Sequence, residues 1–255
     1  MSLNSISKKA QIGSNVKIGD FTVINDDVVI GNNVEIASNV LIDNGARISD
    51  NVKIHHGAVV SSVPQDLKFA GEETTLELGE GSIIREYVTL NRGTKESKKT
   101  VIGKNCFIMS YGHVAHDCRV GDNVIIANAT NMGGHVEIGD WAIVGGIVAV
   151  HQFVKIGMHS MIGGGFRTVR DVPPYIIAGD LPLRFGGLNL IGLRRRGFSS
   201  EKIKKIGDVY DVIFKSGLNV SDAVKKVKDD FEMTEEVKII VDFIDSCKRG
   251  LLKGL

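Results

Sequence analysis

Four histidines in short polar strings are the residues of this chain best suited to chemistry. His113 and His116 lie in HVAHDC, His135 in GGH and His151 in VHQF. A cluster of neutral imidazoles can form a polar substrate pocket with a general base, or it can hold a metal ion. Asp117 follows His116 directly. It could fix the tautomer of that ring and raise its basicity, or it could be a turn residue.

The elements that must position these residues are set by a six-residue repeat. Aliphatic residues recur at every sixth position from Ile12 to Val60 and again from Ile102 to Ile162, where only Met132 is neither isoleucine nor valine. A period of six fits neither a helix nor one long strand. It is typical of a hexapeptide solenoid, in which each short strand and turn buries its aliphatic residue by stacking on neighbouring coils.

The repeat also predicts which residues meet. If three repeats form one coil, as in known hexapeptide folds, residues eighteen apart stack at about 4.8 Å. Val114, Met132 and Val150 then form one inward column, and their neighbours along each strand point outward. We therefore expect a polar group along one outer edge of three adjacent coils, formed by His113, His116, Gly134, His135, His151 and Gln152.

The repeat is interrupted twice and then replaced by a helical pattern. Polar segments near 61–77 and 92–100 should protrude as loops, and the paired prolines of DVPPY, residues 171–175, should end the regular coils. From about Ser199 the apolar period is helical, which predicts three helices with N-caps at Ser199 or Ser200, Ser221 and Thr234. We expect a β-solenoid over residues 1–190 and a helical domain over 191–255.

Composition indicates a soluble cytoplasmic protein. The formal net charge of +1 gives no global reason to expect nucleic acid as a partner or stable insertion into a membrane. Cys106, Cys118 and Cys247 show no metal-type CxxC spacing and are interpreted as buried thiols in a reducing compartment. The first residues lack the apolar region of a signal peptide, and no segment is long and apolar enough for a membrane span.

Several strings together carry a family resemblance that covers essentially the whole chain. They are PQDLKFAGE, IREYVTLNRGT, HVAHDC, GGHVEIGDWAIVGG, AVHQFVKIG, DVPPYIIA and LNLIGLRRRGF. In this order they resemble the UDP-N-acetylglucosamine 3-O-acyltransferase family, the cytoplasmic enzymes that begin lipid A synthesis. The resemblance implies a mainly β fold, a left-handed parallel β-helix with a C-terminal helical domain. It also implies a homotrimer with active sites between subunits.

The resemblance implies a role for each matching residue. His116 would be the general base, with Asp117 behind it, and would deprotonate the sugar 3-hydroxyl. That oxygen would attack the thioester of a 3-hydroxyacyl group on acyl carrier protein, with the Gly134 N–H stabilising the oxyanion. Imidazole suits this task because its ordinary pKa, about 6.5, lies near neutral pH. No cofactor and no metal is implied; the acyl donor is a co-substrate.

The remaining matches concern substrate binding. His113, His135, His151 and Gln152 match residues that hold the sugar and phosphates, while Asp66 and Lys68 would reach the sugar from a neighbouring subunit. Asn189 and Arg195 match contacts to the nucleotide diphosphate. Gly164, Phe166 and Arg167 lie in the region that sets acyl-chain length. The basic stretch from Arg194 to Arg196, continued by Lys202, Lys204 and Lys205, suits an acidic carrier protein.

Several alternatives stay open at this point. The chain has NATNMGGH where family members usually have NNATLAGH, so the acceptor could carry a 3-hydroxyl or a 3-amino group. A related N-acyltransferase of the same pathway carries an extra N-terminal uridine-binding domain, whereas here the repeat begins by Ile12. A zinc enzyme of the γ-carbonic anhydrase type has paired histidines five apart, whereas His113 and His116 are three apart. A non-catalytic scaffold is the third alternative.

Overall fold

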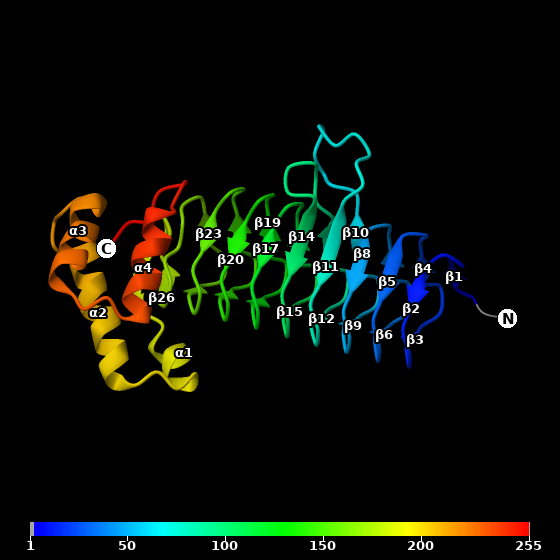
Figure 1. Cartoon of the computed structure of the whole chain (residues 1–255), viewed down its shortest axis with the longest axis horizontal. Coiled ribbons are helices and arrows are strands. Elements are labelled where there is room, and N and C mark those ends of the chain that lie inside the picture. Colours follow the sequence, from blue (N-terminus) through cyan, green and yellow to red (C-terminus); the bar gives the residue numbers. More distant parts are fainter. Residues whose placement is uncertain (1–2, 255) are drawn as a thin grey trace.

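Short parallel strands wind into a long triangular β-helix that ends in a group of helices (Figure 1). The computed structural model describes residues 3–254. Sheet A contains β1 (Ser5–Ile6), β4 (Val23–Ile24), β7 (Leu41–Ile42), β10 (Val59–Ser62), β13 (Thr89–Asn91), β16 (His113–Val114), β19 (Asn131–Met132), β22 (Ala149–Val150) and β25 (Arg167–Thr168). Sheet B contains β2 (Gln11–Ile12), β5 (Val28–Ile30), β8 (Ala46–Ile48), β11 (Thr75–Leu78), β14 (Lys99–Ile102), β17 (Arg119–Val120), β20 (Glu137–Ile138) and β23 (Lys155–Ile156). Sheet C contains β3 (Lys17–Ile18), β6 (Glu35–Ile36), β9 (Lys53–Ile54), β12 (Ile83–Ile84), β15 (Phe107–Ile108), β18 (Ile125–Ile126), β21 (Ile143–Val144), β24 (Met161–Ile162), β26 (Ile176–Gly179) and β27 (Arg184–Leu188).

The strand register confirms the eighteen-residue coil. Val114 pairs with Met132, and Met132 pairs with Val150 on the next coil. The repeated aliphatic side chains from Ile24 onward point inward and are almost fully buried. Because each coil buries its aliphatic residues against the coils on both sides, the hydrophobic core runs along the axis.

Each of the three edges of the prism consists of turns and takes its name from the two sheets that it joins. The A/B edge includes Asp117 and His135, and the B/C edge includes Trp141 and His159. All four have a positive φ, between 56° and 61°. Residues other than glycine rarely adopt this backbone conformation. The stacked coils support it, since the turn N–H of His135 donates to the carbonyl of His116 on the preceding coil at 3.1 Å. The C/A edge completes the prism.

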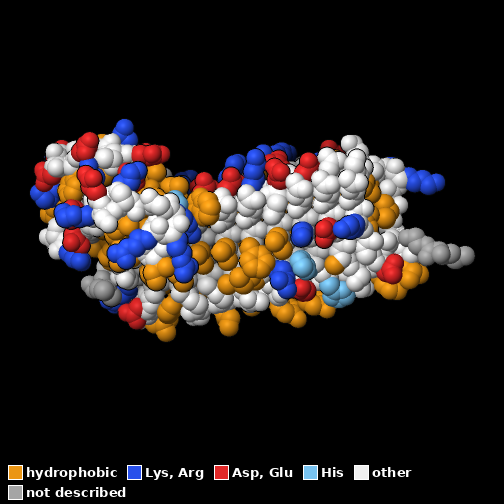
Figure 2. All heavy atoms as spheres, turned by 90° about the horizontal axis from the view of Figure 1, so that it is seen from below, with side chains coloured by type: hydrophobic (Ala, Val, Ile, Leu, Met, Phe, Trp, Pro, Cys, Tyr) orange, Lys and Arg blue, Asp and Glu red, His pale blue; other side chains and the backbone are white. Residues whose placement is uncertain are grey.

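Sheet C carries an apolar stripe on its outer surface. Ile83, Phe107, Ile125, Ile143 and Met161 occupy successive outward positions in register. Figure 2 looks onto this side of the molecule and shows hydrophobic side chains gathered along the middle of the solenoid. The outward position one coil before Ile83 is Lys53. The stripe therefore covers only the C-terminal half of this face.

Two loops protrude where the repeat is interrupted, and Figure 1 shows them on the same side of the solenoid. The first connects β10 to β11 and spans 63–74, and the second connects β13 to β14 and spans 92–98. Asn91 fastens the base of the first loop by donating to Ser62 Oγ at 2.8 Å and to the carbonyl of Val63 at 3.1 Å.

The prediction that the coils end at DVPPY was wrong. Val172 bridges to Ile156, and β26 pairs in parallel with β24 before β27 returns antiparallel to it. Pro173 and Pro174 occur between these pairings, where no ladder N–H is required of them. The coil therefore continues past the prolines, and the antiparallel strand is what ends it.

Four helices follow, one more than the three predicted. They are α1 (Leu190–Arg195), α2 (Ser200–Lys215), α3 (Val220–Asp230) and α4 (Glu235–Asp245). Ser199 caps α2 as predicted, but Asn219 and not Ser221 caps α3, because its side chain accepts from the N–H of Asp222 at 2.9 Å. Thr234 precedes α4 without a side-chain capping bond. Among the described residues, no helix has the length and apolar character of a membrane span.

Candidate active site

His116 and Asp117 form a hydrogen-bonded pair on the A/B edge. His116 Nδ1 lies 2.8 Å from Asp117 Oδ2. The carboxylate can only accept while it is ionised, so Nδ1 carries the proton and Nε2 presents a free lone pair. Asp117 occupies a turn with a positive φ of 60°, and its carboxylate also orients the His116 ring.

The carboxylate of Asp117 is buried and saturated with donors. Asp117 is 4% exposed. Its carboxylate accepts hydrogen bonds from the Thr94 N–H at 2.9 Å, from Thr94 Oγ1 at 2.7 Å and from Ser97 Oγ. Burial alone would raise the pKa of Asp117, but the hydrogen bonds from Ser97, His116 and Thr94 lower it to about 2. The carboxylate therefore stays ionised at neutral pH and holds one tautomer of His116.

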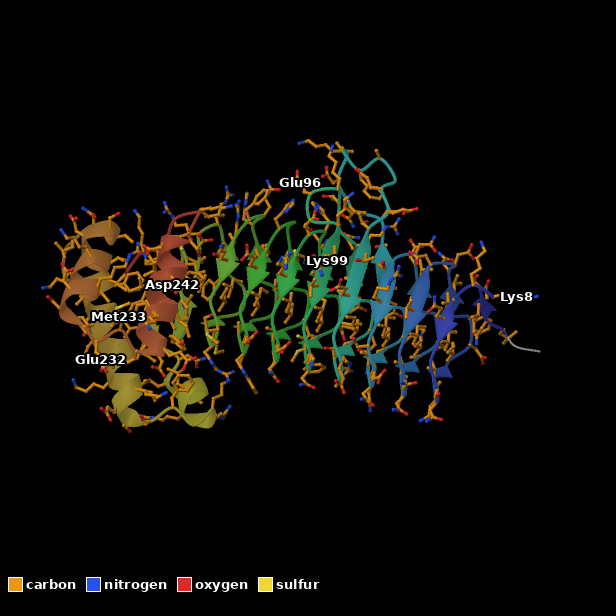
Figure 3. All side chains as sticks on the ribbon, in the orientation of Figure 1. Lys8, Glu96, Lys99, Glu232, Met233 and Asp242 are labelled. Carbon is orange, nitrogen blue, oxygen red and sulfur yellow. The ribbon has the colours of Figure 1, made fainter. Side chains whose placement is uncertain are left out.

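Thr94 and Ser97 belong to the 92–98 loop, and the repeat pattern did not identify them as site residues. Figure 3 shows Glu96 on the same loop, next to β14, which begins at Lys99. Glu96 Oε2 lies 3.6 Å from His135 Nε2. The sequence signals for this loop were the interruption of the repeat and the string IREYVTLNRGT, which ends at Thr94. They gave the position of the loop but not its contacts.

His135 stands beside the pair on the next coil. Its ring contacts His116 edge to face, with centroids 5.3 Å apart, and stacks on Phe153 at 4.5 Å. Potential ligand atoms of His116, Asp117 and His135 lie within 4.8 Å of one another, a grouping that could hold a cation. Both oxygens of Asp117 already accept hydrogen bonds from protein groups, however, so the arrangement favours a base oriented by a carboxylate.

Gly134 brings backbone close to the His116 ring. A Cβ at Gly134 would lie 2.8 Å from His116 Nε2 and 2.6 Å from Cε1. Among the described residues, the Gly134 N–H makes no hydrogen bond, so it is free to donate to a ligand. The glycine thus leaves open the space beside the free lone pair, and its own N–H is unpaired among the described residues.

We expect Gly134→Ala to lower kcat by about 100-fold, because the added methyl must displace the His116 ring. Gly207→Ala in α2 is the matched control, since its Cβ would meet Leu188 Cδ1 at an ordinary 3.5 Å. Steady-state rates of both variants check the prediction. Equal rates would show that the space beside His116 is not needed.

The other histidines of the edge have separate environments. His113 Nδ1 lies 2.8 Å from Thr89 Oγ1. Burial, with a smaller effect from His116, lowers the pKa of His113, which favours its neutral form. His151 lies one coil beyond His135 and contacts Arg249 from the C-terminal segment. Gln152 is next to it and exposed.

Two other predicted groups lie elsewhere on the chain. Asp66 and Lys68 are on the exposed first loop, where Asp66 Oδ1 accepts from the Lys68 N–H at 3.0 Å. Asn189 is 3% exposed and caps α1, and its Nδ2 donates to the carbonyl of His159 at 2.9 Å. Arg195 is exposed at the end of that helix. Asn189 and Arg195 are therefore at the B/C edge, while His116 is at the A/B edge.

The B/C edge also carries an aromatic column. Trp141, His159 and Tyr175 stack on successive coils at 6.4 and 5.7 Å, and Arg196 lies 5.2 Å above the Trp141 ring. Burial, followed by the charge of Arg196, lowers the pKa of His159 to about 4. Together with the Asn189 hydrogen bond, this packing fixes α1 and its arginines against the edge.

The predicted acyl-length residues follow the C/A edge. Gly164 is exposed, and a Cβ there would lie 3.1 Å from the carbonyl of Gly146 on the preceding coil. Phe166 folds back so closely that a Cβ at Gly163 would lie 2.8 Å from its ring. Arg167 is exposed at the start of β25, in register with Ala149.

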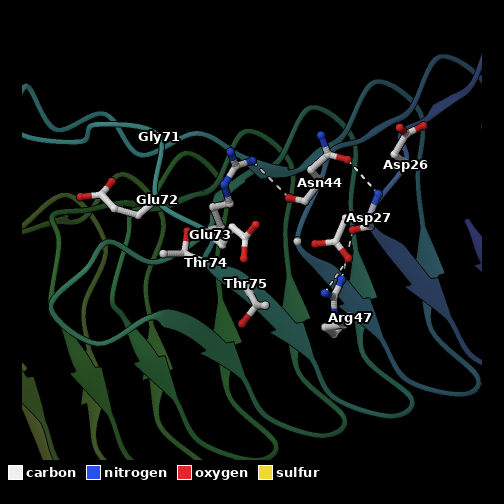
Figure 4. A pocket seen from close by; sticks show the side chains of 11 residues that line it. Asp26, Asp27, Asn44, Arg47, Gly71, Glu72, Glu73, Thr74 and Thr75 are labelled. Carbon is white, nitrogen blue, oxygen red and sulfur yellow. Dashed lines mark hydrogen bonds and ion pairs between the residues drawn. The ribbon is translucent and has the colours of Figure 1, made fainter. Parts of the chain in front are cut away.

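A cavity of about 630 Å³ lies beside the first loop, away from the histidines. Figure 4 shows its lining, in which Asp27 turns toward Arg47 at 2.7 Å. Arg92 donates to the carbonyl of Asn44 at 3.1 Å. These polar groups are bound to one another, and none of the predicted site residues lines the cavity.

Comparisons with known proteins agree with this geometry. Residues 171–252 match a family model described as UDP N-acetylglucosamine O-acyltransferase, domain 2, and residues 9–44 and 99–134 match the bacterial transferase hexapeptide model. The chain is 53% identical over 246 residues to acyl-(acyl-carrier-protein)–UDP-N-acetylglucosamine O-acyltransferase of Chlorobaculum parvum, covering 96% of this chain and 93% of the relative. It is 42% identical to the protein of the same name from Paraburkholderia phymatum, covering 97% of each chain.

Comparison with solved structures also finds UDP-N-acetylglucosamine acyltransferases. The UDP-N-acetylglucosamine acyltransferase of Bacteroides fragilis is 45% identical and covers 99% of both chains with a TM-score of 0.96. The comparisons confirm the predicted fold class, a left-handed parallel β-helix with a C-terminal helical domain.

Proposed function

This chain belongs to the acyl-carrier-protein-dependent UDP-N-acetylglucosamine O-acyltransferase family, and we propose that His116 is the general base of its reaction. The enzyme transfers an acyl chain from acyl carrier protein to the sugar nucleotide in lipid A synthesis. The observation that carries the assignment of His116 is its hydrogen bond to the buried, ionised Asp117.

The reaction follows from this geometry. His116 Nε2 takes the proton of the sugar 3-hydroxyl while Nδ1–H donates to Asp117. The sugar oxygen attacks the thioester carbonyl carbon, and the Gly134 N–H donates to the oxyanion that forms. The carbon–sulfur bond then breaks, and the imidazolium returns the proton to the carrier thiolate. The products are the sugar ester and the free carrier thiol, so the reaction needs no cofactor.

The complete site joins two copies of the chain. Asn189 and Arg195 are held at the B/C edge by the contact to His159, whereas His116 is at the A/B edge. A sugar nucleotide that reaches both His116 and the exposed Arg195 must therefore lie between the A/B edge of one subunit and the B/C edge of the next. Asp66 and Lys68, on a loop that projects from the solenoid, would reach the same space from a neighbouring subunit.

The apolar stripe on sheet C supports a homotrimer. Met161 is 36% exposed, and Ile147, at the neighbouring C/A edge, is 74% exposed. Covering such a face on another subunit removes apolar surface from water. The apolar stripe and the histidine edge are different surfaces of one chain, so a contact between the stripe of one subunit and another surface of the next is head-to-tail. Such a contact closes into a ring of three when successive subunits are related by a rotation of 120°.

The carrier protein has a candidate docking surface on the helical domain. Arg194 and Arg195 are exposed at the end of α1, and Lys204 is exposed on α2. Arg196 lies over the Trp141 ring, Lys202 and Lys205 pair with glutamates of the same domain, and Lys204 pairs with Asp208 of its own helix. Among the described residues, Arg194 and Arg195 make no ion pair of this kind. The exposed cations suit an acidic partner, mainly by accelerating encounter.

Purified protein should acylate UDP-N-acetylglucosamine or its 3-amino analogue when offered a panel of 3-hydroxyacyl carrier proteins of different chain lengths. Mass spectrometry of the sugar nucleotide gives the acyl length, and comparison of the two acceptors gives the sugar preference. The zinc-enzyme alternative predicts loss of activity on chelation, whereas the proposed base predicts unchanged rates. A panel without any transfer would refute the function.

A further inference from the structure

The C-terminal segment passes beside the histidine edge and places an arginine on His151. Arg249 follows α4 by a few residues, and its Nη2 contacts His151 Nδ1 and lies 3.3 Å from Nε2. These are the side-chain hydrogen bonds that Arg249 makes within residues 3–254, where no carboxylate lies within ion-pair distance of it. Its Nε is buried without a partner.

A buried carboxylate fastens this segment to the solenoid. Asp171 is 0% exposed, and its Oδ2 accepts from the Arg249 N–H at 3.1 Å while Oδ1 accepts from the Lys155 N–H at 2.7 Å. The Asp171 N–H donates to the carbonyl of Gly250 at 2.9 Å, and the Leu252 N–H donates to the carbonyl of Asp171 at 3.0 Å. The Arg249 backbone is therefore held independently of its side chain.

The contact restricts what His151 can do. A guanidinium stays protonated and only donates, so the imidazole nitrogen that faces it must accept. Nε2 lies 3.3 Å from Arg249 Nη2 and can fill this role, while Nδ1, which Nη2 also contacts, lies 3.1 Å from the carbonyl oxygen of the neighbouring Gln152, which is itself an acceptor. Arg249 and the Gln152 carbonyl therefore hold the His151 ring in one orientation.

We propose that Arg249 is a positioning residue that aims His151 at the acceptor sugar nucleotide, so the C-terminal segment is part of the active site. The inference rests on the proposed function in taking His151 as a contact to the sugar or its phosphates. Arg249 acts through His151 and not on the reacting atoms. Its loss should therefore weaken binding of the nucleotide more than it slows the chemical step.

The test is a double-mutant cycle on binding of UDP-N-acetylglucosamine, measured by calorimetry on the full-length protein. Arg249→Gln should raise Kd about tenfold, and His151→Gln at least as much. The double variant should bind no more weakly than His151→Gln alone, because Arg249 acts only through that ring. Arg249→Lys, which keeps one donor and the charge, should recover part of the affinity.

Lys248→Gln is the matched control, since Lys248 is exposed, adjacent and of the same charge, and its Kd should not change. Thermal unfolding monitors the fold, because Arg249→Gln keeps the backbone bonds to Asp171. Additive losses in the cycle, an unchanged Kd for Arg249→Gln, or an equal loss in the control would overturn the proposal. Wild-type protein that binds the nucleotide but transfers no acyl group would overturn the proposed function and leave the role of Arg249 standing.

Discussion

Replacing His116 with alanine is expected to lower kcat about 1,000-fold, because general-base catalysis by a positioned side chain contributes about 10² to 10⁴ in rate. No neighbouring histidine can take over the role of the free lone pair on His116 Nε2. His113 is bonded to Thr89, and His135 is next to Glu96 and Asp117. The free energy of unfolding should change little, since the ring is partly exposed and its one hydrogen bond is to Asp117.

Initial rates of acyl transfer at saturating substrates check this expectation. His55→Ala is the matched control, because His55 is a partly exposed histidine that contacts Glu86 on another part of the solenoid. Its rate should equal that of the wild type. A His116→Ala enzyme that keeps more than about a tenth of the wild-type kcat would rule out His116 as the base.

Asp117→Asn is expected to lower kcat by about 10² to 10⁴, although His116 stays in place. The amide can donate to Nδ1, which favours the tautomer with the proton on Nε2, the atom that must accept from the sugar. Asp122→Asn is the control, since Asp122 is a turn aspartate that accepts from the Lys104 N–H at 2.7 Å. It should keep the wild-type rate. Equal losses in both variants would assign the effect to turn structure.

The same carboxylate should make stability depend on acid. The pKa of Asp117 is about 2 in the folded protein, below its ordinary value of 3.8, so the folded state favours the ionised form. The ionised carboxylate of Asp117 therefore adds about 2 kcal/mol to the free energy of unfolding. This contribution is fully present above pH 4 and is lost as the pH falls through about 2. The free energy of unfolding, measured with denaturant, should fall less between pH 7 and pH 3 for Asp117→Asn than for the wild type. An unchanged difference would contradict the low pKa.

The parts of the site that follow the repeat were predictable from sequence. Because residues eighteen apart stack on successive coils, the period alone is enough to place His116 beside Gly134. The partners from outside the repeat could not be predicted in this way. Ser97 reaches Asp117 from a loop, and Arg249 reaches His151 from the C-terminal segment. Such contacts depend on the path of irregular segments, which periodicity does not encode.

Errors at the end of the solenoid have a related cause. Prolines predict a break only if they occur where the ladder needs an N–H, and Pro173 and Pro174 occur between the pairing positions. Ser221 and Asn219 are both good capping residues, so local preference alone could not place the start of α3. In both cases tertiary packing selected between local options.

Mixing two inactive variants tests whether one active site is shared by two subunits. His116→Ala and Arg195→Glu chains, carrying different tags, are co-expressed, and trimers that contain both are purified on the two tags. In every such trimer one interface pairs an intact His116 with an intact Arg195, so we expect about a third of the wild-type transfer rate. If His116 and Arg195 of the same chain formed the site, no site in the mixed trimer would be complete. A rate no higher than that of either variant alone would therefore show that the site is not shared between subunits.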